Sequence, residues 1–147
     1  MTSGTATLAS IAEQRRAAIA HRAAGRYGDA ESILLAAIET ATTVFGDDDA
    51  TAAVLRNDLA VTYKYTGRYT EAEALYWLAL PVLQAALGAD HVVVAAVWHN
   101  LGGIRHAQGD LDAAEQFARR GLTISLAALG DDHLTVAARL WRATATS

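Results

Sequence analysis

The sequence of 147 residues has no cysteine and a single proline, Pro81. The lack of cysteine excludes disulfide bonds, thiolate zinc sites, iron–sulfur clusters and a cysteine nucleophile. No uninterrupted apolar run approaches the roughly 18–20 residues that a membrane-spanning helix needs. Alanine is abundant, and it is the strongest helix former, whereas proline is the weakest. The composition therefore favours an all-α protein.

Positive charge is also in short supply. Twelve basic residues face sixteen acidic ones, which gives a net charge of −4. This balance does not favour binding to nucleic acid or to anionic membranes. The first sixteen residues lack both the basic start and the strong apolar core of a secretory signal. With 52% hydrophobic residues the chain is expected to fold, and we predict one cytoplasmic domain over residues 1–147.

A repeat of 42 residues runs through the chain. Gly25-Arg26-Tyr27 and Gly67-Arg68-Tyr69 are followed at the same spacing by Gly109-Asp110-Leu111. Such self-similarity is the signature of an architecture built from stacked units. The same offset relates three further sets of residues: Ala30-Glu31, Ala72-Glu73 and Ala114-Glu115; Phe45-Gly46, Leu87-Gly88 and Leu129-Gly130; and Ala53, Ala95 and Ala137.

Each period is predicted to hold two antiparallel helices joined at a glycine turn. Between residues 54 and 63 the apolar side chains recur at three- and four-residue spacing, which places them on one face of a helix. Helix pairs of this kind must stack to bury their apolar faces. We therefore predict an α-solenoid with helix pairs at about 7–45, 49–87 and 91–129, a last helix at about 133–145, and loose residues at 1–6. Pro81 is expected to kink its helix rather than to divide it.

Three stretches carry a resemblance to a known family: 57–63 (NDLAVTY), 67–73 (GRYTEAE) and 87–95 (LGADHVVVA). They are similar to tetratricopeptide repeats of the long, kinesin-light-chain type, over roughly residues 8–141. The resemblance implies a right-handed stack whose first helices line a concave groove and whose last helix, at 133–145, caps the end. It also implies a non-enzymatic scaffold that holds a peptide segment of a protein partner.

Polar residues occupy matching positions on the three first helices, on the face opposite the apolar stripe. Such residues are expected to point away from the core, either into the groove or simply into solvent. The cations outnumber the single carboxylate among them, which favours an acidic peptide as the ligand. The predicted groove consists of Arg15, Arg16, Arg22, Asn57, Asp58, Lys64, Tyr65, His99, Asn100, Gly103 and His106.

Little in the sequence points to catalysis, a metal or a cofactor. His99 and His106 are two helical turns apart, about 10 Å, which is too far for one metal ion. The acidic runs 47–49 and 131–132 lack the glycine and glutamate of a calcium loop, so helix capping explains them better. Two alternatives stay open. One is a small-molecule binder or enzyme that uses His99, His106 and Asp58, and the other is a module that only dimerises.

Two further expectations concern apolar residues. Trp98 and Gly102 fall at positions where the repeat packs its helices, so both are predicted to lie in the core. Leu140 and Trp141 belong to the last helix, which has no partner helix after it. This uncovered surface predicts a homodimer through the C-terminal end.

Overall fold

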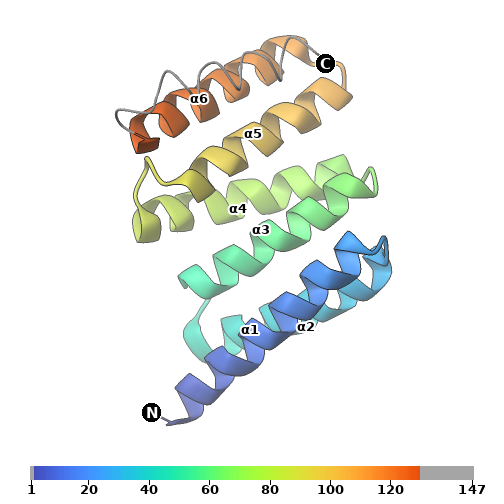
Figure 1. Ribbon diagram of the computed structural model, residues 1–147, viewed down its shortest axis with the longest axis vertical. Helices are drawn as coiled ribbons and strands as arrows, with labels where there is room; N and C mark the ends of the chain where they lie inside the picture. The colour runs from blue at the N-terminus through green and yellow to red at the C-terminus, as the bar shows by residue number, and fades with distance from the viewer. Residues whose placement is uncertain (1, 130–147) are drawn as a thin grey trace. The chain divides into compact units, whose positions relative to one another are not determined.

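A computed structural model describes residues 2–129, and within that range all regular structure is helical. The helices are α1 (Thr2–Ala23), α2 (Tyr27–Phe45), α3 (Ala50–Tyr65), α4 (Tyr69–Leu87), α5 (Val92–Ala107) and α6 (Leu111–Leu129), shown in Figure 1. The predicted all-α fold is confirmed. None of these six helices is long and apolar enough to cross a membrane. The helix expected at 133–145 lies outside the described residues.

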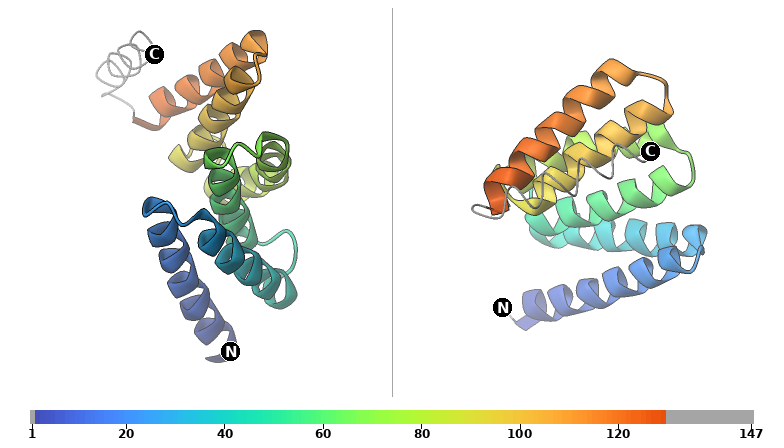
Figure 2. Two further views of the ribbon diagram at one scale, coloured as in Figure 1. Left: turned by 90° about the vertical axis from the view of Figure 1, so that its right-hand side faces the viewer. Right: turned by 45° about the horizontal axis from the view of Figure 1, so that its top comes forward.

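The chain forms two compact units, one up to Val82 and one from Leu83 onwards. In the first unit α1 packs against α2, α2 packs against α3, and α1 also reaches α3. In the second unit α5 and α6 form an antiparallel pair, as Figure 2 shows. Each unit has its own buried side chains. They include Leu34, Leu55 and Tyr76 in the first and Val94, Leu101 and Ile104 in the second.

The turn inside each helix pair is the same. Gly25, Gly67 and Gly109 have φ angles of 79°, 77° and 83°, in the left-handed region that glycine adopts without strain. In each case the next residue donates its N–H to the carbonyl oxygen five residues earlier. The three bonds are Arg26 to His21 at 2.8 Å, Arg68 to Tyr63 at 2.9 Å and Asp110 to Arg105 at 2.9 Å. This repetition explains the 42-residue period.

Small residues let the paired helices approach closely. A Cβ atom added at Gly102 of α5 would lie 3.2 Å from the carbonyl oxygen of Ala114 in α6. One added at Gly121 of α6 would lie 3.1 Å from the carbonyl oxygen of Ala95. The expected packing role of Gly102 is therefore confirmed, whereas Gly121 was not singled out from the sequence. Trp98 is also in the core, as expected, with 7% of its surface exposed.

The helix starts agree with capping in two places and correct one expectation. Asp49 accepts the N–H of Thr51 at 2.8 Å, and His91 Nδ1 accepts the N–H of Val93 at 3.1 Å. The expectation of loose residues is wrong for 2–6, because α1 begins at Thr2. Adding residues to an existing helix costs far less than nucleating one, so the helix extends beyond its packed part. Pro81 lies inside a single helix, as expected, and the kink there stays a prediction.

Candidate functional site

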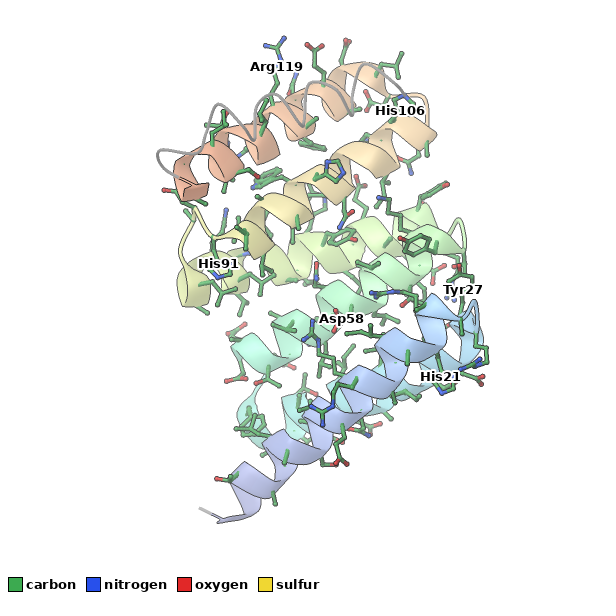
Figure 3. The ribbon with its side chains drawn as sticks, in the orientation of Figure 1. His21, Tyr27, Asp58, His91, His106 and Arg119 are labelled. Atoms are coloured by element: carbon green, nitrogen blue, oxygen red, sulfur yellow. The ribbon has the colours of Figure 1, made fainter. Side chains whose placement is uncertain are left out.

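The predicted polar positions of α1 and α3 meet at one carboxylate. Arg15 Nε donates to Asp58 Oδ2 at 2.5 Å, and Arg15 Nη2 lies 3.4 Å from Asp58 Oδ1. Figure 3 shows Asp58 on α3 beside α1. The hydrogen bond to this carboxylate raises the pKa of Arg15. The guanidinium therefore serves as a clamp between the first helices of two successive repeats.

Asp58 was expected on an exposed polar face, and this expectation is wrong. Only 4% of the residue is exposed. Its carboxylate can be buried because Arg15 supplies both an opposite charge and hydrogen bonds, without which burial would be very costly. Its backbone carbonyl oxygen accepts the hydroxyl of Thr62 at 3.0 Å. Asp58 therefore holds Arg15 in place instead of offering a free carboxylate to a ligand.

Arg22 approaches the same residue from about two turns further along α1. Its Nη1 atom lies 3.5 Å from the backbone carbonyl oxygen of Asp58. A carbonyl group is neutral, so this contact orients the guanidinium without cancelling its charge. Arg16, next to Arg15 in sequence, is exposed. The two guanidinium groups at Asp58, from Arg15 and Arg22, therefore carry more charge than its single carboxylate.

Two other predicted residues of α3 are only partly accessible. The Oδ1 atom of Asn57 is buried and has no hydrogen-bond partner among residues 2–129. A buried amide oxygen without a partner is unusual, because most buried polar atoms form a hydrogen bond. Lys64 is half-buried, and burial lowers its pKa. Both residues lie on the helix that carries Asp58.

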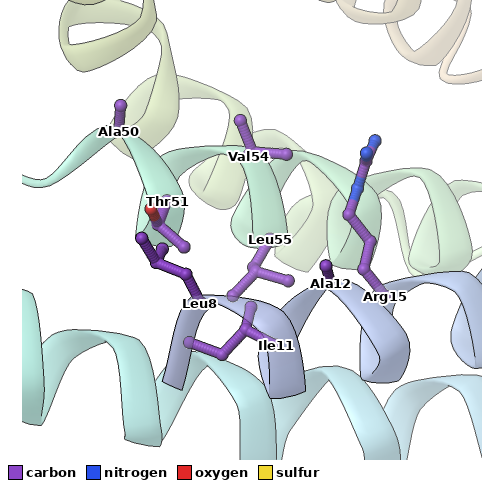
Figure 4. A pocket seen from close by; sticks show the side chains of 8 residues that line it. All are labelled: Leu8, Ile11, Ala12, Arg15, Ala50, Thr51, Val54 and Leu55. Atoms are coloured by element: carbon purple, nitrogen blue, oxygen red, sulfur yellow. The ribbon is translucent and has the colours of Figure 1, made fainter. Parts of the chain in front are cut away.

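A hollow of about 290 Å³ opens beside Arg15, between the N-terminal halves of α1 and α3 (Figure 4). Its wall is mostly apolar, and Arg15 is the charged residue among the described side chains that line it. Sequence reasoning missed this hollow, because it assigned such apolar positions to the core and could not place α1 against α3. The lining residues are Leu8, Ile11, Ala12, Arg15, Ala50, Thr51, Val54 and Leu55.

Tyr65, predicted to line the groove, is 65% exposed at the end of α3. Its ring is stacked on that of Tyr27, with centroids 6.1 Å apart and an interplanar angle of 12°. One face of the Tyr65 ring is thus covered by Tyr27. The pair forms an aromatic surface at the turn end of the first unit.

The remaining predicted residues belong to α5 in the second unit. His99 and His106 are exposed, and Asn100 and Gly103 are half-buried. The alternative that combines both histidines with Asp58 loses support, since Arg15 already occupies that carboxylate. Within residues 2–129, no three His, Asp or Glu side chains lie close enough together to hold a metal ion.

The repeated turn and the paired helices agree with the family that the sequence matches. A model of the tetratricopeptide repeat matches residues 7–85 and again 51–127. The chain belongs to the tetratricopeptide repeat family. No curated protein matches the chain in sequence.

Two solved structures extend this result. BtubC (BKLC) from P. vanneervenii superposes with a TM-score of 0.72 and 25% identity, over 78% of this chain. This similarity supports a tetratricopeptide repeat protein of the kinesin-light-chain type. The chain spans 45% of the length of BtubC. The N-terminal domain of stress-induced protein-1 (STI-1) from C. elegans superposes with a TM-score of 0.65 and 16% identity. The match covers 92% of this chain and 97% of the STI-1 domain, and at this identity it supports the fold alone.

Proposed function

We propose that this tetratricopeptide repeat domain binds an acidic peptide segment of a partner protein along the polar faces of α1 and α3. The family assignment supports a scaffold for protein–protein interaction. The preference for an acidic ligand rests on one observation, the meeting of Arg15 and Arg22 at Asp58. Two guanidinium groups from α1 meet at this residue of α3, Arg15 at its carboxylate and Arg22 at its backbone carbonyl oxygen. Arg16 and Lys64 add further positive charge nearby in the sequence.

The geometry suits a carboxylate ligand in a specific way. Asp58 fixes the orientation of Arg15, while 43% of the Arg15 side chain stays exposed. A guanidinium has five N–H donors in a planar fork, so Arg15 can bind Asp58 and still donate to a ligand carboxylate. Arg22 supplies a second guanidinium at the same residue of α3, and Asn57 is proposed as a further polar contact.

Other predicted residues extend the proposal. His99, Asn100, Gly103 and His106 of α5 are proposed as further contacts for the peptide, and Tyr65 as a stacking surface. The homodimer predicted through Leu140 and Trp141 concerns residues outside those described, and light scattering on Trp141→Asp against the parent tests it. The cytoplasmic location expected from the sequence is also part of the proposal.

Selection from a random peptide library tests the ligand preference and does not require the partner to be identified first. Twelve-residue peptides displayed on phage would be selected against the parent and against an Arg16→Glu/Arg22→Glu variant. We expect the parent to enrich peptides rich in Asp and Glu, and the variant to lose that enrichment. Selected peptides without an acidic bias would contradict the proposal.

Binding of one selected peptide then locates the site. Arg22→Glu should weaken binding far more than Arg119→Glu, and the loss should shrink at high salt because exposed charges are screened beyond about 8–10 Å. Arg119 is a suitable control because it is exposed on α6 and pairs with Glu115 of its own helix, at 2.6 Å. Arg120 is less suitable, since its guanidinium lies over the Trp98 ring, 4.8 Å from its centroid. Equal effects of the Arg22 and Arg119 reversals would refute the site.

A further inference from the structure

Helix α4 carries an exposed apolar stripe that the interaction surface on α1 and α3 does not use. Ala74, Trp77, Leu78 and Pro81 are all exposed, Trp77 by 40% and Leu78 by 61%. Their spacing of three, four and seven residues places them on one face of the helix. No charged residue occurs between residues 74 and 89. The outward face of α4 is therefore apolar where it meets solvent.

The next repeat shows that the fold does not require an apolar stripe at these exposed positions. At the positions 42 residues later, helix α6 has exposed polar residues: Gln116, Arg119, Arg120 and Thr123. These are what a solvent-facing helix surface normally carries. Trp77 and Leu78 thus stand where the same scaffold accepts two arginines. An exposed apolar patch of this kind indicates a contact surface.

We propose that this stripe packs against the same stripe of a second copy of the chain, with the two α4 helices antiparallel. Along the stripe the side chains are small, large, large and small, so their order of size is the same in both directions of the helix. A two-fold axis between residues 77 and 78 would place Ala74 opposite the partner's Pro81 and would bring Trp77 and Leu78 each beside its own copy. Each large side chain then meets an apolar neighbour, and no charge from either stripe is buried. A two-fold contact of this kind is the commonest form of self-association.

The size of the stripe determines the strength expected of the contact. Seven residues of helix span about 10 Å, so each copy contributes a short contact area. Such an area belongs to the weak end of specific interfaces, below about 1,200 Å² in total. The dimer should therefore form reversibly and depend on concentration. This inference is independent of the peptide site, which is proposed for α1, α3 and α5.

Sedimentation analysis of the full chain over a concentration series tests the dimer. As concentration increases, the apparent mass of the parent should rise from 15.5 kDa towards twice that value. Trp77→Arg/Leu78→Arg, which copies the residues of α6, should raise the dissociation constant about tenfold or more, because large buried side chains dominate such contacts. The control is Leu35→Arg, at the position of α2 equivalent to Trp77 and 47% exposed. It should associate like the parent.

A cross-linking experiment locates the two-fold axis with a milder substitution. Because the chain has no cysteine, Leu78→Cys introduces its only thiol. Under mild oxidation this variant should form a disulfide-linked dimer, whereas Ala36→Cys, the equivalent exposed position of α2, should stay largely monomeric. The proposal is overturned if the parent is monomeric at all concentrations. This holds even if Trp77 and Leu78 then prove to bind a different protein. It is equally overturned if both cysteines cross-link alike, or if Trp141→Asp abolishes the dimer while the double arginine variant keeps it.

Discussion

Removal of Arg15 should reveal how strongly the first two repeats depend on its contact with Asp58. In Arg15→Met the side chain keeps most of its length and its apolar contacts but loses its charge. The Asp58 carboxylate, 6% exposed, is then left without its ion-pair partner. An unpaired buried charge is much less favourable than a paired one, so the free energy of unfolding should fall.

The size of the effect follows from the exposure of the two partners. Breaking an ion pair buried on both sides costs about 3–5 kcal/mol, whereas an exposed pair is worth about 0.2–1 kcal/mol. The Asp58 side chain is buried, but the Arg15 side chain is 43% exposed, so solvent screens part of the interaction. We therefore expect a loss of about 2 kcal/mol, within the range for hydrogen bonds to charged groups.

Urea unfolding followed by circular dichroism measures this loss, as a shift of the midpoint by roughly 1 M. Arg16→Met is the matched control, since Arg16 is exposed on the same helix, and it should change stability by less than about 0.5 kcal/mol. Asp58→Asn added to Arg15→Met should recover part of the loss, because the buried charge disappears. A double-mutant cycle with no coupling, or equal stabilities of Arg15→Met and Arg16→Met, would refute the reasoning.

Three further predictions concern stability in urea. Ala72→Leu should cost about 1–3 kcal/mol because Ala72 is fully buried, while Ala36→Leu on an exposed face should cost little; equal costs would contradict the packing. Gly67→Ala should destabilise by about 1 kcal/mol because its φ is 77°, whereas Gly28→Ala, helical with open space, should stabilise; the reverse order would refute this. Burial lowers the pKa of Lys64, so the folded state loses this proton before the unfolded chain does. Stability should therefore gain a contribution as pH rises from the lowered pKa to 10.5, and Lys64→Met should lack it.

Much of the fold could be predicted because the turns between its helices depend on local sequence. A left-handed turn strongly favours glycine, so Gly25, Gly67 and Gly109 mark the turns in the sequence as directly as they do in the structure. The six described helices lie close to their predicted ranges for the same reason. The start of α1 was missed because helix extension depends on cooperativity and not on an apolar anchor.

The site was less predictable because burial depends on partners distant in sequence. Helical periodicity places Asp58 on the polar face of α3, but it cannot show that Arg15, 43 residues earlier, covers that face. The apolar stripe of α4 was missed for the opposite reason. Trp77 and Leu78 look like core residues in a sequence, and only their exposure in the structure distinguishes them from Tyr76, which is fully buried.

The joints between successive repeats are interchangeable in their local geometry. Gly46 and Gly88 both have φ of 97°, and each donates its N–H to the carbonyl oxygen four residues earlier at 3.0 Å. If a gene duplication or deletion added or removed 42 residues of the protein at these points, the flanking helices would be joined by a turn that the chain already uses. An exchange that joins two non-equivalent positions would instead connect helices through a turn that lacks this glycine geometry. The protein can thus change length in units of one repeat, and its turns restrict which unequal recombination events leave a foldable product.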